Sequence, residues 1–191
     1  MATVALIVDW CGPFASIEDA KGAARDFQLG EVLYLATGKR RYQRHSTMQY
    51  VGISNDPESR FTKNHHRLPE LTKSFALWIG EISSHGIAGR RAQRHPVAHG
   101  RAVELAEWAL AYFLALPLNV KKRKTPPPES VMLMNRWFRD DFETKRVQRG
   151  HKEWPDFIEF EPAYDFARIQ WFGSPGRSRR FSEAGIKALA I

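Results

Sequence analysis

Cysteine is almost missing from this sequence, because Cys11 is the single one among 191 residues. A lone cysteine excludes a disulfide framework within the chain and a zinc site built from several cysteines. The histidines His45, His95 and His99 show no metal-ligand spacing with a cysteine or a carboxylate, so a mixed zinc site is not expected either. Such sparse use of cysteine fits a cytoplasmic protein.

Long hydrophobic runs are also missing. The N-terminal segment MATVALIVDWCGPF is apolar, but no basic residue precedes it and Asp9 interrupts it. It therefore predicts a first β-strand rather than a signal peptide. The longest later apolar segment, residues 108–118, has about half of the ~20 residues that a membrane-spanning helix requires. We therefore expect a soluble, cytoplasmic protein without a membrane partner.

Negative charge is in the minority. The sequence has 29 lysines and arginines against 21 acidic residues, which gives a formal net charge of +8. An excess of positive charge is typical of proteins that bind polyanions such as nucleic acid. Charge that only keeps the protein soluble is the alternative. Hydrophobic residues make up 43% of the chain, enough for a packed core.

The hydrophobic pattern predicts a strand and a helix followed by the order β-β-α-β-α. A strand at residues 31–37 and another at 48–53 should form an antiparallel hairpin with a basic tip. The other expected elements are a strand at 3–8, a helix at 16–28 capped by Ser16 and ended by Gly30, a helix from Asp56-Pro57 to about residue 65, a strand at 74–83, and a helix at 102–116 closed by Pro117.

A proline-rich basic linker, VKKRKTPPPES, divides the chain. Further strands are expected at 131–138, 156–161 and 167–172, before a basic loop and a short C-terminal helix. The predicted organisation is an N-terminal strand and helix (1–30), a core (31–120), the linker (121–130) and a β-rich extension (131–191).

Two tyrosine-bearing strand motifs stand out in the core. VLY occupies residues 32–34 and YVG residues 50–52. Arg60 lies ten residues after Tyr50, and Glu107 lies twelve residues before Asn119. Because these motifs occur in this order on the expected strands and helices, residues 31–119 resemble a GIY-YIG nuclease domain. Two departures are Val32 in place of the usual first glycine and a longer spacing between the two tyrosines.

The resemblance implies an α+β fold with a small antiparallel or mixed three-stranded sheet flanked by helices. It also implies a metal-dependent endonuclease that hydrolyses DNA, with Tyr34, Tyr50, Arg60 and Glu107 performing the chemistry. One tyrosine would position or deprotonate the attacking water and the other would orient the phosphate. Related nucleases often carry a histidine one helical turn after the arginine, and His65 is the candidate here.

Glu107 is the expected ligand of the metal, Mg²⁺, with Mn²⁺ as a substitute. Its neighbours one helical turn away are apolar, so the carboxylate must be paired, metal-bound or at the lip of a cleft. Mg²⁺ suits a site with one carboxylate because it keeps several waters. The alternative is an ion pair with an arginine of the basic connector AGRRAQRHPVAHGR (residues 88–101), and Glu104 is the second candidate ligand.

Basic side chains gather in three segments around these residues. They are expected to contact the phosphate backbone, which provides affinity without sequence recognition. The predicted nucleic-acid-binding residues are Lys39, Arg40, Arg41, Arg44, Arg90, Arg91, Asn119, Lys121 and Lys122. Asn119 would also brace the site. Two other interpretations remain: a non-catalytic nucleic-acid-binding module on the same scaffold, and a protein-interaction domain whose charge is incidental.

Overall fold

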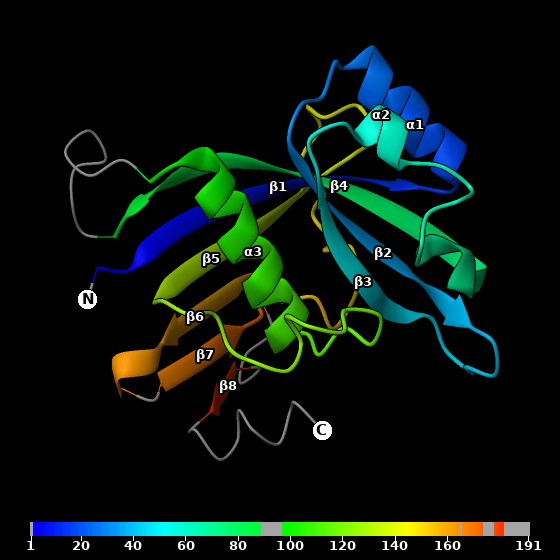
Figure 1. Ribbon diagram of the computed structural model, residues 1–191. Coiled ribbons are helices and arrows are strands. Elements are labelled where there is room, and N and C mark those ends of the chain that lie inside the picture. The colour runs from blue at the N-terminus through cyan, green and yellow to red at the C-terminus, as the bar shows by residue number, and fades with distance from the viewer. Residues whose placement is uncertain (1, 89–96, 165, 174–177, 182–191) are drawn as a thin grey trace.

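The computed structural model describes residues 2–88, 97–164, 166–173 and 178–181, and one mixed sheet runs through them (Figure 1). The strand order is β3-β2-β4-β1-β5-β6-β7-β8. All neighbours are antiparallel except β1 and β5, which are parallel. The strands are β1 (Val4–Phe14), β2 (Val32–Arg40), β3 (Thr47–Ser54), β4 (Leu71–Ile87), β5 (Val131–Phe138), β6 (Phe157–Glu161), β7 (Phe166–Gln170) and β8 (Ser178–Phe181).

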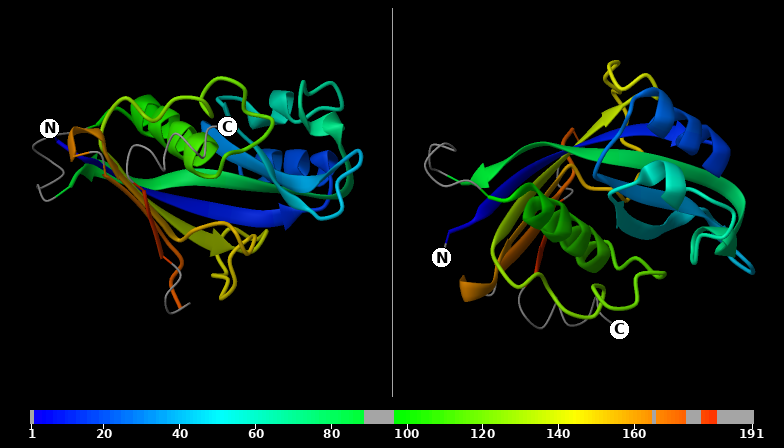
Figure 2. Two further views of the ribbon diagram at one scale, coloured as in Figure 1. Left: turned by 90° about the horizontal axis from the view of Figure 1, so that it is seen from below. Right: turned by 45° about the horizontal axis from the view of Figure 1, so that its top comes forward.

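The predicted fold class, a small three-stranded sheet, is wrong. The expected strands β2, β3 and β4 are present, but β1 pairs with β4 on one side and with β5 on the other. The sheet therefore continues into the strands that were expected to form a C-terminal extension, and it curls strongly (Figure 2). The physical reason is that β4 has two edges with backbone groups to satisfy: β2 pairs with one edge, and β1 pairs with the other and with the part of the 17-residue strand that extends beyond β2.

Three α-helices accompany the sheet in the described part of the chain: α1 (Ile17–Asp26), α2 (Pro57–Arg60) and α3 (His99–Phe113). The predicted cap of α1 is confirmed, because the Asp19 amide donates to Ser16 Oγ at 3.0 Å. The helix ends at Asp26, however, before Gly30. The Asp56 cap of α2 is also confirmed, but this helix has only four residues. The expected C-terminal helix lies outside the described residues.

The predicted β2–β3 hairpin is confirmed, and it places two hydrophobic clusters on opposite faces of the sheet. Leu33 and Leu35 pack with α3 and with a group of tryptophans. Tyr34 and Ala36, which alternate with them, pack with α1, α2 and the chain after α3. Helix α3 lies across one face of the sheet (Figure 2). Among the described residues, no helix is long and apolar enough to cross a membrane.

Candidate active site

Tyr34 and Tyr50 lie side by side on adjacent strands. Tyr34 pairs with Gly52 and Tyr50 with Ala36, so both rings point to the same face, with centroids 5.8 Å apart. The Tyr34 ring lies directly over Gly52: a Cβ at that position would stand 2.5 Å from the Tyr34 hydroxyl. The glycine of the YVG motif is therefore required for the close approach of the two tyrosines.

His65 is buried, and its hydrogen bonds determine its tautomer. The backbone amides of Arg67 and Leu68 donate to His65 Nδ1 at 3.0 and 3.1 Å. Nε2 therefore carries the proton and donates to the Tyr34 hydroxyl at 2.9 Å. Burial, and then the charges of Arg60 and His66, lower the pKa of His65 to about 4. The imidazole is thus neutral at physiological pH.

Arg60, at the end of α2, links the buried tyrosine to the surface. Its Nε donates to the Tyr34 hydroxyl at 3.1 Å, and its Nη2 donates to His66 Nδ1 at 3.3 Å. Burial raises the pKa of Tyr34 and outweighs the opposing effect of the guanidinium. Tyr34 therefore stays protonated, and its hydroxyl holds Arg60 in one orientation.

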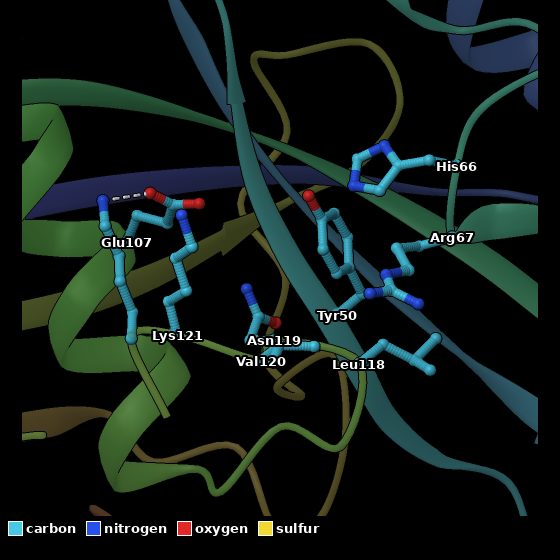
Figure 3. Close-up of a pocket in the computed structure, with 9 residues that line it drawn as sticks. Tyr50, His66, Arg67, Glu107, Leu118, Asn119, Val120 and Lys121 are labelled. Atoms are coloured by element: carbon cyan, nitrogen blue, oxygen red, sulfur yellow. Dashed lines mark hydrogen bonds and ion pairs between the residues drawn. The ribbon is translucent and has the colours of Figure 1, made fainter. Parts of the chain in front are cut away.

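A hollow of about 320 Å³ opens beside Tyr50, and Glu107 of α3 forms its opposite wall (Figure 3). The Tyr50 hydroxyl and the Glu107 carboxylate point into the same space. The lining residues are Tyr50, His66, Arg67, Glu107, Leu118, Asn119, Val120, Lys121 and Lys122. Residues far apart in sequence thus place one carboxylate among several cationic side chains and an imidazole.

The Glu107 carboxylate forms an ion pair with Lys122. Lys122 Nζ lies 2.5 Å from Glu107 Oε2, and the two side chains are only 24% and 14% exposed. The same ammonium lies 5.6 Å from the centroid of the Trp108 ring. The ion-pair partner of Glu107 is therefore Lys122. The predicted alternative to a metal was an ion pair with an arginine of the basic connector. Glu104, the second candidate ligand, pairs with Arg101 instead.

Asn119 braces the edge of the sheet. Its Oδ1 accepts from the Val51 amide at 2.9 Å, and its Nδ2 donates to the Val51 carbonyl at 2.7 Å. The Leu118 amide also donates to the Gln49 carbonyl at 3.0 Å. Because β3 is an edge strand, these bonds satisfy backbone groups that have no neighbouring strand. The Asn119 carboxamide is thus largely committed to the protein itself.

The predicted nucleic-acid-binding side chains separate into two places. Lys121 and Lys122 line the hollow. Lys39 and Arg40 are half-buried at the end of β2, whereas Arg41 and Arg44 are exposed in the turn that follows. The last two predicted residues, Arg90 and Arg91, lie outside the described part of the chain.

His66 and Arg67 line the hollow, and the sequence reasoning passed over both. His66 is exposed and stacks on His65, with ring centroids 4.7 Å apart. Burial, and then the charges of Arg60 and Arg67, lower its pKa. The prediction favoured His65 because a helix was expected to continue past Arg60. Since α2 stops at Arg60, the chain turns and presents the second histidine to the surface.

The hollow contains one carboxylate, Glu107, that could bind a divalent metal. No group of three or more histidine, cysteine or acidic side chains that could hold a metal occurs within the described residues. One carboxylate is compatible with Mg²⁺, which is often bound by one or two carboxylates together with waters and substrate phosphates. The Lys122 ammonium occupies the Glu107 carboxylate, so a metal ion at this position would have to displace it.

Comparison with protein-family models, with curated proteins and with solved structures finds no match to this chain. The resemblance to GIY-YIG nucleases therefore rests on the sequence motifs alone, because the sheet differs from the small three-stranded one that the family implies.

Proposed function

We propose that this protein is a metal-dependent endonuclease that hydrolyses phosphodiester bonds of DNA in the hollow between Tyr50 and Glu107. The observation that carries the proposal is the convergence of a phenol, an imidazole, a guanidinium and a carboxylate from four separate segments. Phosphodiester hydrolysis requires a positioned water and relief of negative charge on the phosphate. The hollow offers side chains for both tasks.

Tyr50 and Tyr34 take different roles in this proposal. Tyr34 is fully buried and its hydroxyl accepts from His65 and Arg60, so it acts as a positioning residue. Tyr50 lines the hollow, and its hydroxyl, which interacts with Tyr34 and Arg60, would orient the attacking water or a phosphate oxygen. His65 serves to hold Tyr34, because its Nε2 proton is donated and its Nδ1 is occupied by two amides.

Arg60 and His66 would contact the phosphate. Arg60 supplies a permanent positive charge and remaining N–H donors. Because His66 Nδ1 accepts from Arg60, its proton lies on Nε2, where it can donate to a phosphate oxygen. When bound at Glu107, Mg²⁺ or Mn²⁺ would neutralise phosphate charge and acidify a bound water. Glu107 would hold that ion, and Lys121 and Lys122 would attract the phosphate backbone.

Plasmid nicking with Mg²⁺ tests the proposal, with two glutamates of α3 as a matched pair. Glu107→Gln removes the charge in the hollow while preserving the shape of the side chain. Glu104→Gln makes the same change one turn earlier, on a side chain that pairs with Arg101. We expect Glu107→Gln to lower cleavage roughly 10²-fold or more, and Glu104→Gln to cut as the wild type does. Equal cleavage by all three proteins refutes the assignment.

A non-catalytic nucleic-acid-binding module is the second candidate, and the Glu107–Lys122 ion pair favours it. A carboxylate neutralised by an ammonium leaves the hollow with the charges of Arg67 and Lys121 and no free acid. Such a hollow would bind a phosphate backbone without cutting it. Binding that weakens steeply with salt, together with no cleavage by the wild type at any Mg²⁺ or Mn²⁺ concentration, would favour this candidate.

A further inference from the structure

The connection between β5 and β6, residues 139–156, forms a fixed platform. Trp154 is completely buried, and its ring centroid lies 4.8 Å from that of Trp10. The Arg146 amide donates to the Trp137 carbonyl at 2.8 Å, and the Asn135 amide donates to the Asp156 carbonyl at 2.8 Å. These contacts at its middle and end hold the connection against the sheet.

Two adjoining hollows lie on this platform, with volumes of about 440 and 430 Å³. Val147 and Gln148 belong to both hollows and form the ridge between them. The basic side chains of the two linings are Arg139, Lys145, Arg146, Arg149 and Lys152. Within the described residues, no carboxylate lines either hollow.

The cations of the platform fall into two groups. Two arginines are oriented by the protein: Arg149 Nη2 donates to Asp156 Oδ2 at 2.8 Å, and Arg146 Nη1 donates to the Gly12 carbonyl at 3.2 Å. Lys145 and Lys152 are exposed and carry their charge into solvent. Hydrogen bonds from the Thr144 side chain, and then from the Thr144 and Glu143 amides, lower the pKa of the nearby Asp141 and hold its carboxylate against the following turn.

Exposed apolar side chains stand beside these charges. Phe172 is 52% exposed and lines the second hollow with Arg149 and Lys152. Val147, on the ridge, is fully exposed. An exposed aromatic ring among cations is the arrangement that binds single-stranded nucleic acid, because a base stacks on the ring while phosphates approach the cations.

The platform adjoins the basic hairpin. His151 Nε2 lies 3.4 Å from the Ser46 carbonyl at the start of β3, and the exposed Arg44 lies two residues before Ser46. The platform therefore contacts the basic hairpin, whose strand β3 carries Tyr50.

We propose that the platform binds a single-stranded stretch of nucleic acid, with a base on Phe172 and phosphates at Lys145 and Lys152. The class of partner rests on the proposed nuclease function, but the binding needs neither metal nor cleavage. It would give the protein a second contact with its substrate, outside the hollow that contains Glu107.

Fluorescence anisotropy with a labelled twelve-nucleotide oligo(dT) in EDTA tests this proposal. Phe172→Ala should weaken binding about tenfold. The matched control is Tyr164→Ala, which removes an aromatic ring that is 75% exposed and lines neither hollow. The double variant Lys145→Ala/Lys152→Ala should reduce the slope of log K against log salt by about 1.4, the value for two phosphate contacts on a single strand. Circular dichroism verifies that each variant is folded.

Three outcomes would overturn the proposal. The first is an affinity of folded Phe172→Ala equal to that of Tyr164→Ala. The second is equal binding of oligo(dT) and an abasic oligomer by the wild type, which would mark a general polyanion site. Photocrosslinking of an oligomer with 5-iodouracil should label the peptide containing Phe172, and labelling confined to the hollow near Tyr50 would also contradict it. Failure of plasmid cleavage leaves these binding results unchanged, so the two proposals fail separately.

Discussion

Replacing Asn119 by alanine should loosen the edge strand that carries Tyr50. The substitution removes two hydrogen bonds and leaves the N–H and C=O groups of Val51, a residue with 0% exposure, without partners. A buried polar group that loses its partner costs about 1–3 kcal/mol. For two such groups, with some relief from entering water, we expect a loss of about 3 kcal/mol in the free energy of unfolding. In a chain of this size that lowers the Tm by roughly 6–12 °C.

The control for Asn119→Ala is Asn64→Ala, which makes the same change at an exposed position. Thermal unfolding by circular dichroism measures both, and hydrogen exchange at the Val51 amide reports the local effect. Asn119→Asp should lie between them, because a carboxylate still accepts from the Val51 amide but presents an oxygen to its carbonyl. Equal unfolding temperatures of Asn119→Ala and Asn64→Ala would refute the role of Asn119 as a brace. If Asn119→Ala then lost DNA binding but no stability, this would support the contact between Asn119 and nucleic acid that the sequence predicts.

Two further predictions concern the neighbours of this strand. Lys122→Met should increase the affinity of Glu107 for Mn²⁺ about tenfold, because a competing ammonium is removed. Lys121→Met, at an exposed lysine of the same hollow, should change that affinity much less. Titration followed by electron paramagnetic resonance measures both affinities, and equal effects of the two variants would contradict the prediction. His65 should destabilise the fold in acid: its pKa is 6.5 when unfolded and about 4 when folded, so the unfolded chain binds the extra proton between these values. The contribution of the neutral His65 to the free energy of unfolding, up to about 3 kcal/mol, is complete above pH 6.5 and is lost as the pH falls to 4. In urea unfolding measured across this pH range, His65→Gln should flatten the dependence of stability on pH.

Local elements were readable from sequence wherever a short-range rule acts. Ser16 and Asp56 mark helix starts because their side chains accept from amides three residues on. The segment VMLMNRWF, rich in apolar and aromatic residues, was predicted to form a strand, and β5 spans residues 131–138 as expected. Helix lengths were less predictable: α2 ends after four residues because the chain turns so that His65 Nδ1 can accept two backbone amides, an interaction with no sequence signature.

The candidate site also has features that the sequence predicts and features that it does not. The sequence by itself determined which residue types are available: two tyrosines on neighbouring strands, an arginine on a helix that starts at Asp56-Pro57, and a carboxylate on an apolar helix. That the two tyrosines share a face was not determined in this way, because it depends on the pairing register, which shifts by one residue between Ala36 and Thr37.

Only the tertiary structure decided that Lys122 neutralises Glu107, that Asn119 closes the edge of β3, and that β1 joins two sets of strands into one sheet. Each of these contacts joins residues that are distant along the chain or separated by a turn of unpredictable path. A hydrophobic pattern states that a strand needs neighbours and that a carboxylate needs a partner. The choice among the available partners depends on how the whole chain packs, because every candidate satisfies the same local chemistry.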